Sequence, residues 1–109
     1  MAKTINFKYE GMEYTLEFTR KSVKTMENGG FNLSELDSKP MTVLPTLFAG
    51  AFLAHHKYVK EEVIDEIYAH MPNKKDLVEK LAEMYNEPIE ALVSEPVDSE
   101  KNVEWGASW

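Results

Sequence analysis

The stretch that decides the fold is TINFKYEGMEYTLEF, which runs from Thr4 to Phe18. Apolar and polar residues alternate on both sides of the pair Glu10-Gly11, as they do in half-buried strands. A two-residue turn at this pair places Tyr9 opposite Met12 and brings both apolar rows onto one face. The sequence therefore predicts an antiparallel β-hairpin over residues 3–18. The other facing pairs of this register are Phe7 with Tyr14 and Ile5 with Leu16.

Helices are expected after the hairpin, because a bare hairpin is only marginally stable in water and its apolar face needs a cover. Apolar residues recur at helical spacing between capping residues and prolines. Thr19 can cap the first helix, and Gly29-Gly30 supplies the left-handed residue that commonly ends one. Asn32 and Asn73 each precede an acidic residue by three positions, which is capping-box spacing. The pattern predicts helices at approximately 19–28, 42–56, 60–71 and 74–93.

Two prolines affect where these helices run. A helix that begins near Thr42 has Pro45 in its first turn, where the missing N–H needs no intrahelical partner. Pro88 interrupts the apolar pattern of the last helix. The apolar residues after Pro88 belong either to a kinked continuation or to a separate last turn, and the sequence leaves both alternatives open.

Length and composition indicate one globular domain. A chain of 109 residues is about the usual size of a single domain, and 43% hydrophobic with 28% charged residues is ordinary for a folded protein. We expect an α+β, mostly helical fold in which the N-terminal two-stranded antiparallel β-hairpin packs on a bundle of about four helices. Residues 1–94 are expected to form this domain. Residues 95–109 are expected to form a flexible acidic tail, because polar residues without a period prevail after Ser94.

Charge and residue content exclude several classes of function. The formal net charge of -7 would repel a phosphate backbone, and the one arginine, Arg20, leaves few forked donors for nucleic acid. The sequence contains no cysteine, which excludes disulfides and thiolate chemistry. The longest uncharged run, residues 40–54, is shorter than the roughly 20 residues that span a bilayer, and no secretory signal precedes the hairpin. We therefore expect a cytoplasmic protein that binds neither nucleic acid nor membrane.

No constellation of residues indicates catalysis, a metal or a cofactor. His55 and His56 are adjacent, so on a helix their side chains point about 100° apart and do not readily chelate one ion. We expect these histidines to be solvated or to lie near a helix C-terminus, where positive charge is favourable. The acidic residues of the helix at 60–71 fall on its solvated face. The sequence thus predicts neither an enzyme nor a metal or cofactor site.

Five apolar residues are candidates for partner binding: Trp105, Trp109, Met41, Phe48 and Phe52. The last three belong to an apolar stripe, which is either a groove for a partner helix or, as the favoured interpretation, part of the core. Both tryptophans lie in the predicted tail, where they cannot easily be core, and aromatic anchors contribute strongly where short segments dock. They either fold back on their own domain or bind another protein.

The order of these features resembles the small tail assembly chaperones of long-tailed bacteriophages of Gram-positive bacteria and of their prophages. The quoted features are the hairpin end LEFTRKSVK (residues 16–24), a glycine stop before Phe31, KPMTVLPTLF (residues 39–48), Gly50-Ala51-Phe52 with His55-His56, and a terminal tryptophan. The resemblance covers nearly the whole chain. It implies a protein that binds the tape measure protein and keeps it soluble during tail morphogenesis in the host cytoplasm. The family's members are absent from the mature virion.

The resemblance also implies further partners. In such phages a programmed ribosomal frameshift often adds a second domain, which recruits tail tube protein, and a tail after Ser94 suits such an extension. Several copies could coat one long client, so weak homo-oligomerisation is compatible with this role.

Two other functions stay open at this point. The first is a structural head–tail or tail completion protein of a phage particle. The second is an acidic inhibitor or adaptor that mimics nucleic acid. That function requires one continuous acidic field, whereas lysines interrupt the candidate carboxylates in the sequence. The carboxylates are those of Glu61, Glu62, Asp65, Glu66 and Glu87, and the lysines are Lys57, Lys60 and Lys80.

Overall fold

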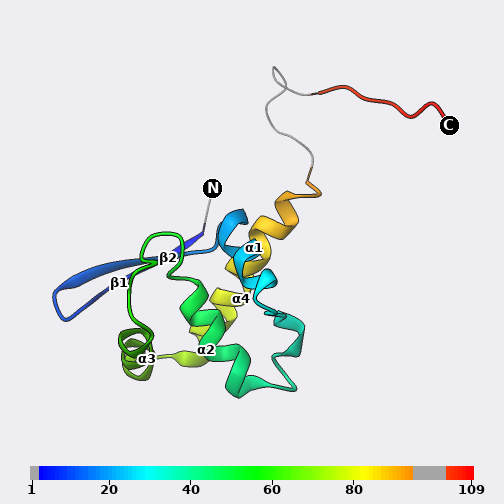
Figure 1. Cartoon of the computed structure of the whole chain (residues 1–109). Helices are drawn as coiled ribbons and strands as arrows, with labels where there is room; N and C mark the ends of the chain where they lie inside the picture. The colour runs from blue at the N-terminus through cyan, green and yellow to red at the C-terminus, as the bar shows by residue number, and fades with distance from the viewer. Residues whose placement is uncertain (1–2, 95–102) are drawn as a thin grey trace.

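Figure 1 shows the computed structural model of the chain, in which a two-stranded hairpin lies beside four α-helices. The structure describes residues 3–94 and 103–109. Its elements are β1 (Thr4–Tyr9), β2 (Met12–Glu17), α1 (Arg20–Asn28), the 3-10 helix η1 (Leu33–Glu35), α2 (Pro40–Gly50), α3 (Glu61–His70) and α4 (Lys74–Ala91). The predicted fold class, α+β with an N-terminal antiparallel hairpin on about four helices, is confirmed.

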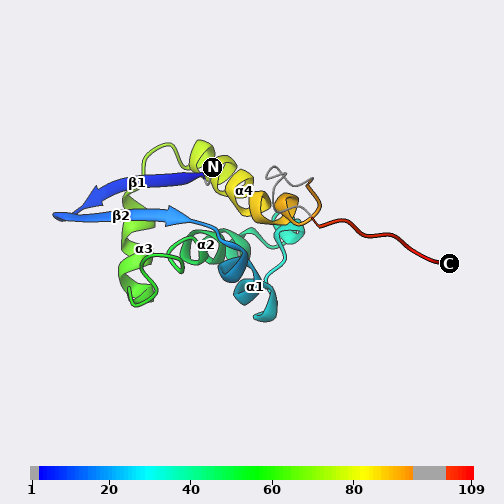
Figure 2. The same ribbon diagram turned by 90° about the horizontal axis from the view of Figure 1, so that it is seen from above.

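The hairpin has the register that the turn position predicts. The facing pairs are Tyr9 with Met12, Phe7 with Tyr14 and Ile5 with Leu16. Both turn residues have positive φ, 49° at Glu10 and 82° at Gly11, which is the backbone that matches a two-residue turn to the twist of the strands. Figures 1 and 2 place this turn at one end of the domain and the C-terminal end of α4 at the other.

One hydrophobic cluster joins the hairpin to the four helices. Phe52, which follows α2, lies edge-on to Tyr14 of β2, with ring centroids 5.8 Å apart. It also packs against Phe48 of α2 at 5.2 Å. Such edge-to-face pairs add to the stabilisation from burial alone. The largest side chains that are less than 2% exposed are Phe48, Phe52, Leu16, Leu47, Ile67 and Leu81.

The predicted bounds of α2 are wrong at both ends. The helix begins at Pro40, which is preorganised for the first helical position, so Pro45 lies inside it. The ring of Pro45 removes only the bond to the carbonyl of Met41, an exposed residue of the first turn. The helix ends at Gly50 instead of residue 56. The carbonyl of Ala51 accepts the N–H of Glu17 at 3.1 Å, and the chain continues in tight turns.

The predicted capping residues differ in outcome. Thr19 forms a capping box, because its hydroxyl accepts the N–H of Ser22 at 3.1 Å while its own N–H donates to the Ser22 hydroxyl at 2.8 Å. Asn32 caps η1 through the N–H of Ser34 at 3.0 Å. Asn73 makes no side-chain cap, which corrects that prediction. It instead adopts a left-handed backbone, φ 52°, in the short connection from α3 to α4.

α4 runs without interruption from Lys74 to Ala91, so the residues that follow Pro88 continue the same helix. Proline at this position removes one backbone bond, to the carbonyl of Met84, and leaves the neighbouring bonds in place. Of the two alternatives left by the sequence, the structure shows a continuation rather than a separate turn. The predicted tail begins beyond this helix. Of its residues, 103–109 are described, while 95–102 lie outside the described part of the chain.

The segment after α2 closes the outer edge of β2. Thr15 N–H donates to His56 Nε2 at 3.0 Å, and Glu17 N–H donates to the Ala51 carbonyl at 3.1 Å. His55 Nε2 lies 2.6 Å from a carboxylate oxygen of Glu17. The two histidines therefore bind the hairpin rather than cap a helix, and of the two only His55 is exposed to solvent, as expected. Occupied N–H groups also protect this strand edge from pairing with another chain.

Gly50 allows α1 and α2 to approach closely, and this gives a first prediction. A Cβ at Gly50 would overlap the Cε and Sδ atoms of Met26, a core residue that is 6% exposed. Gly50→Ala should therefore lower the free energy of unfolding by about 1–3 kcal/mol through overpacking. Alanine in an unobstructed helix would raise it instead, so the sign of the change in urea unfolding decides.

Gly29→Ala is the matched control for this experiment. A Cβ there meets only backbone oxygens at 3.5 and 3.7 Å, which is ordinary van der Waals contact. Its stability should change by no more than about 0.5 kcal/mol. A Gly50→Ala protein as stable as the parent would contradict the prediction and show that the end of the Met26 side chain moves aside at little cost.

The bond from Thr15 to His56 gives a second prediction, on pH. Burial lowers the pKa of His56 below its ordinary value of 6.5, and the charge of the neighbouring His55 lowers it further. The folded chain thus binds fewer protons here than the unfolded chain, so this contribution to stability is complete above 6.5 and is lost as the pH falls through the lowered pKa. Urea unfolding between about pH 7.5 and pH 5 measures the loss.

His56→Gln keeps a hydrogen-bond acceptor but removes the titration, so it should flatten this part of the pH dependence. His70→Gln is the control, since His70 is exposed and its Nδ1 lies 2.9 Å from the carbonyl of Glu66 within its own helix. Equal slopes in the parent and in His56→Gln would contradict the assignment to His56.

Candidate partner-binding surface

The five residues predicted for partner binding lie in two different environments. Phe48 and Phe52 are each 1% exposed, because aromatic rings from β2 and α3 enclose them. The apolar stripe on α2 is therefore core at these two positions, and they are not accessible to a partner. Met41 is 88% exposed at the start of α2, and Trp105 and Trp109 are 84% and 102% exposed. Met41 is thus the exposed end of the stripe, and the structure does not bring the two tryptophans to it.

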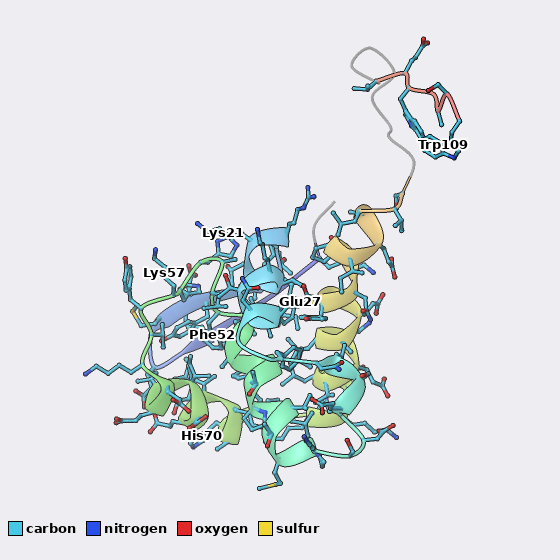
Figure 3. All side chains as sticks on the ribbon, turned by 45° about the vertical axis from the view of Figure 1, so that its right-hand side comes forward. Lys21, Glu27, Phe52, Lys57, His70 and Trp109 are labelled. Atoms are coloured by element: carbon cyan, nitrogen blue, oxygen red, sulfur yellow. The ribbon has the colours of Figure 1, made fainter. Side chains whose placement is uncertain are left out.

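A groove lies between α1 and the C-terminal half of α4. Two adjoining hollows of about 420 and 600 Å³ form it, and Glu27 and Ile89 line both. The other lining residues are Arg20, Val23, Lys24, Pro88 and Leu92 in the first hollow, and Gly30, Phe31, Asn32, Leu33, Ser34, Tyr85 and Asn86 in the second. Both volumes fall in the range of about 300–1,000 Å³ that is usual for binding pockets. Figure 3 shows Glu27 between the two helices. We call this surface the α1–α4 groove.

The groove arises because the apolar stripe of α4 extends beyond the residues of the other helices that pack against it. Leu77, Leu81 and Met84 are buried against the other helices. The stripe then continues to Ile89 and Leu92, which are 38% and 57% exposed. The continuous path of α4 through Pro88 keeps these two residues in line with the core face. The end of α4 therefore presents apolar side chains that the rest of the domain leaves uncovered.

Tyr85 lies at the base of the groove, where it is only 4% exposed. Its ring lies edge-on to Phe18 at the end of the hairpin and to Phe31 before η1, with centroids 5.3 Å apart in both pairs. Burial raises the pKa of Tyr85, and the nearby charge of Glu27 raises it further. Its hydroxyl is therefore neutral at physiological pH. A neutral phenol between two phenyl rings is typical of an apolar contact surface with one polar end.

Opposite charges occupy different sides of α4. On one side, Lys3 Nζ forms a salt bridge with Glu83 at 2.9 Å, and Lys3 N–H donates to Glu87 at 3.3 Å. Bonding to Lys3 lowers the pKa of Glu83. These contacts fix the C-terminal half of α4 beside β1. On the groove side, the hollow that Leu92 lines is basic on balance, because α1 contributes Arg20 and Lys24 against one carboxylate, that of Glu27.

A second groove, of about 730 Å³, separates the N-terminal part of α1 from the segment after α2. Lys21 and Lys57 line it from its two sides, and Figure 3 shows both lysines on the same side of the molecule. Its two histidines, His55 and His56, already contact the hairpin through Glu17 and Thr15. We therefore attribute this second groove to the packing of the segment after α2 against the outer edge of β2, and we do not consider it a candidate site.

Within residues 3–94 and 103–109, no three His, Cys, Asp or Glu side chains are grouped so that they could hold a metal ion. None of the helices in that part of the chain combines the length and apolar character that a membrane span needs. The feature that stands out is the α1–α4 groove. The sequence signals it only through apolar residues that follow Pro88, and periodicity alone does not show that their cover ends before they do.

Comparison with known proteins gives a family but no characterised relative. No curated protein matches the chain, and no solved structure matches it. A protein family described as "Domain of unknown function (DUF5055)" matches residues 1–109. Because this match spans the whole sequence, the chain belongs to the DUF5055 family.

Proposed function

We propose that this chain is a protein-binding module that holds a helical segment of an unassembled partner in the α1–α4 groove. The observation that carries the proposal is the uncovered apolar end of α4, where Ile89, Leu92 and Val93 are 38%, 57% and 86% exposed. Long grooves between two helices accept an amphipathic helix through its apolar face. Phe31, which is only partly buried and packs edge-on against Tyr85, supplies an aromatic surface for such a face.

The expected affinity suits a role in holding a partner and releasing it. Full burial of one leucine or isoleucine side chain contributes about 1.5–3 kcal/mol. Ile89 and Leu92 are already partly covered, so each would contribute only part of this amount. Association also costs translational and rotational freedom. Binding through one groove should therefore be weak and reversible, as a chaperone that later yields its client requires.

The resemblance to phage tail assembly chaperones suggests which partner this is. We propose the tape measure protein, kept soluble in the host cytoplasm until the tail tube assembles around it, with the chaperone absent from the mature virion. A longer frameshifted product would continue from the end of α4, beside the groove, and would recruit tail tube protein there. Several copies along one client would place neighbouring domains close together and favour weak homo-oligomers.

The alternative of an acidic inhibitor fits the structure less well. Glu61, Glu62, Asp65 and Glu66 belong to α3, whereas Glu87 belongs to the C-terminal half of α4. Figures 1 and 2 show these elements toward opposite ends of the domain, so the carboxylates do not share one face. Glu87 also accepts the N–H of Lys3. The other alternative, a head–tail or tail completion protein, differs from the proposal in predicting that the chain is present in purified virions.

Co-expression of the full chain with the tape measure protein of the same phage tests the proposal. The intact chain should keep the client soluble and co-purify with it. Leu92→Glu places a charge in the groove and should weaken binding by at least about tenfold, which corresponds to about 1.4 kcal/mol. The fraction of client recovered in the soluble, co-purified pool measures the effect.

Met41→Glu is the matched control, because it introduces the same charge at another exposed apolar residue, outside the groove. It should leave client recovery unchanged. Equal recovery with Leu92→Glu and with the parent would exclude the groove as the binding surface. An intact chain that neither binds nor solubilises the client, but is found in virions, would favour the completion protein instead.

A further inference from the structure

We infer that the chain's own segment Val103–Trp109 docks in the α1–α4 groove, with its tryptophans as anchors and Glu104 beside Arg20 and Lys24, which line it. In the structure this segment is extended, and Trp109 in Figure 3 lies well away from the helices. The inference concerns a contact within one chain, so it does not depend on what the protein binds or on the proposed function.

The first argument is that the segment and the groove each leave apolar surface exposed. Trp105 and Trp109 are 84% and 102% exposed, and a tryptophan carries one of the largest apolar surfaces of any side chain. Ile89 and Leu92, at 38% and 57%, are the exposed apolar residues that line the groove. Bringing the two surfaces together removes both from water.

The second argument is proximity along the chain. Leu92 lies just after α4, and residues 95–102 join Ser94 to Val103. An extended chain spans at most about 3.6 Å per residue, so eight residues reach about 29 Å. Leu92 is only two residues before Ser94, which makes this reach ample. Such a short connection gives an effective concentration of about a millimolar.

The third argument is charge complementarity. The whole chain carries a net charge of -7, so most of its surface repels an acidic segment. The hollow that contains Leu92 differs, because Arg20 and Lys24 outnumber its one acidic residue, Glu27. Within residues 3–94 and 103–109, neither of these two cations forms a salt bridge. Glu104, next to Trp105, can pair with either one, and the guanidinium of Arg20 can stack on an indole ring.

Other exposed apolar residues lack this combination. Met41 stands at the first turn of α2, away from the end of α4 in Figure 1, and lines neither hollow of the groove. The ring of Tyr58 already forms a cation–π contact with Lys57, whose Nζ lies 5.1 Å from the ring centroid. In contrast to these two residues, the α1–α4 groove combines uncovered apolar residues, an arginine and closeness to the segment.

Tryptophan fluorescence of the full chain tests the inference directly, since both tryptophans of the sequence lie in this segment. With an effective concentration of about 1 mM and an intrinsic Kd of about 100 µM, roughly nine-tenths of the molecules are docked. The emission should then be shifted to shorter wavelength, and acrylamide should quench it less than in a free peptide of residues 103–109. Single variants Trp105→Phe and Trp109→Phe show which ring is the stronger anchor.

Two groove variants identify the docking surface. Leu92→Glu should weaken docking about tenfold and lower the docked fraction to about one-half. Arg20→Glu should also shift the emission toward that of the free peptide, and Arg20→Glu combined with Glu104→Arg should restore it. Met41→Glu should change nothing. Circular dichroism of each variant shows whether the helices are intact, and the charge-swapped pair gives a readout that a folding defect cannot imitate.

Three results would overturn the inference. In the first, the full chain matches the free peptide in emission and in quenching, so the segment is not docked. In the second, the wavelength shift disappears on dilution, so a second copy of the chain is the occupant. In the third, docking persists unchanged in both Leu92→Glu and Arg20→Glu, so the segment binds another surface.

Discussion

The rest of the structure depends on the packing of Phe52 beneath the hairpin. Its ring contacts Tyr14 at 5.8 Å and Phe7 at 6.5 Å on the strands, and Phe48 at 5.2 Å on α2. The hairpin alone could not hold its apolar face together in water. Because Phe52 comes just after α2, this contact also sets where that helix ends and how the next segment returns to the outer edge of β2. α2 in turn contacts both α1 and α4, which also contact each other beside the groove.

Much of the fold could be predicted from the sequence, because it is encoded in local patterns. Alternation and a two-residue turn predict the hairpin register, and Thr19 is a residue type that favours the N-cap it occupies. The errors occurred where tertiary contacts override local signals. Glu17 bonds the carbonyl of Ala51, and His56 bonds Thr15, so the helix predicted to residue 56 ends at Gly50. No pattern within residues 42–56 shows that this segment forms hydrogen bonds with the hairpin.

For the candidate site, too, local patterns could be predicted from the sequence and tertiary contacts could not. The sequence identifies apolar residues but not which of them remain uncovered, and so it placed Phe48 and Phe52 among the candidates although both are core. Conversely, Ile89 and Leu92 continue an apolar stripe that is core in its first part. They are exposed because the other helices pack only against that first part. If the groove holds both the client and the segment Val103–Trp109, the two compete for it. A docked segment would then cover the apolar surface of the free chain until a client helix displaces it.

We propose that the α1–α4 groove is the surface that contacts a partner. Hydrogen–deuterium exchange of the full chain, with and without the bound tape measure protein, tests this most directly because it locates the contact on every element at once. The account predicts that protection on binding is concentrated in α1, in the residues around η1 and in the C-terminal half of α4. Protection confined to the acidic helix α3, or to the first turn of α2 around Met41, would contradict it.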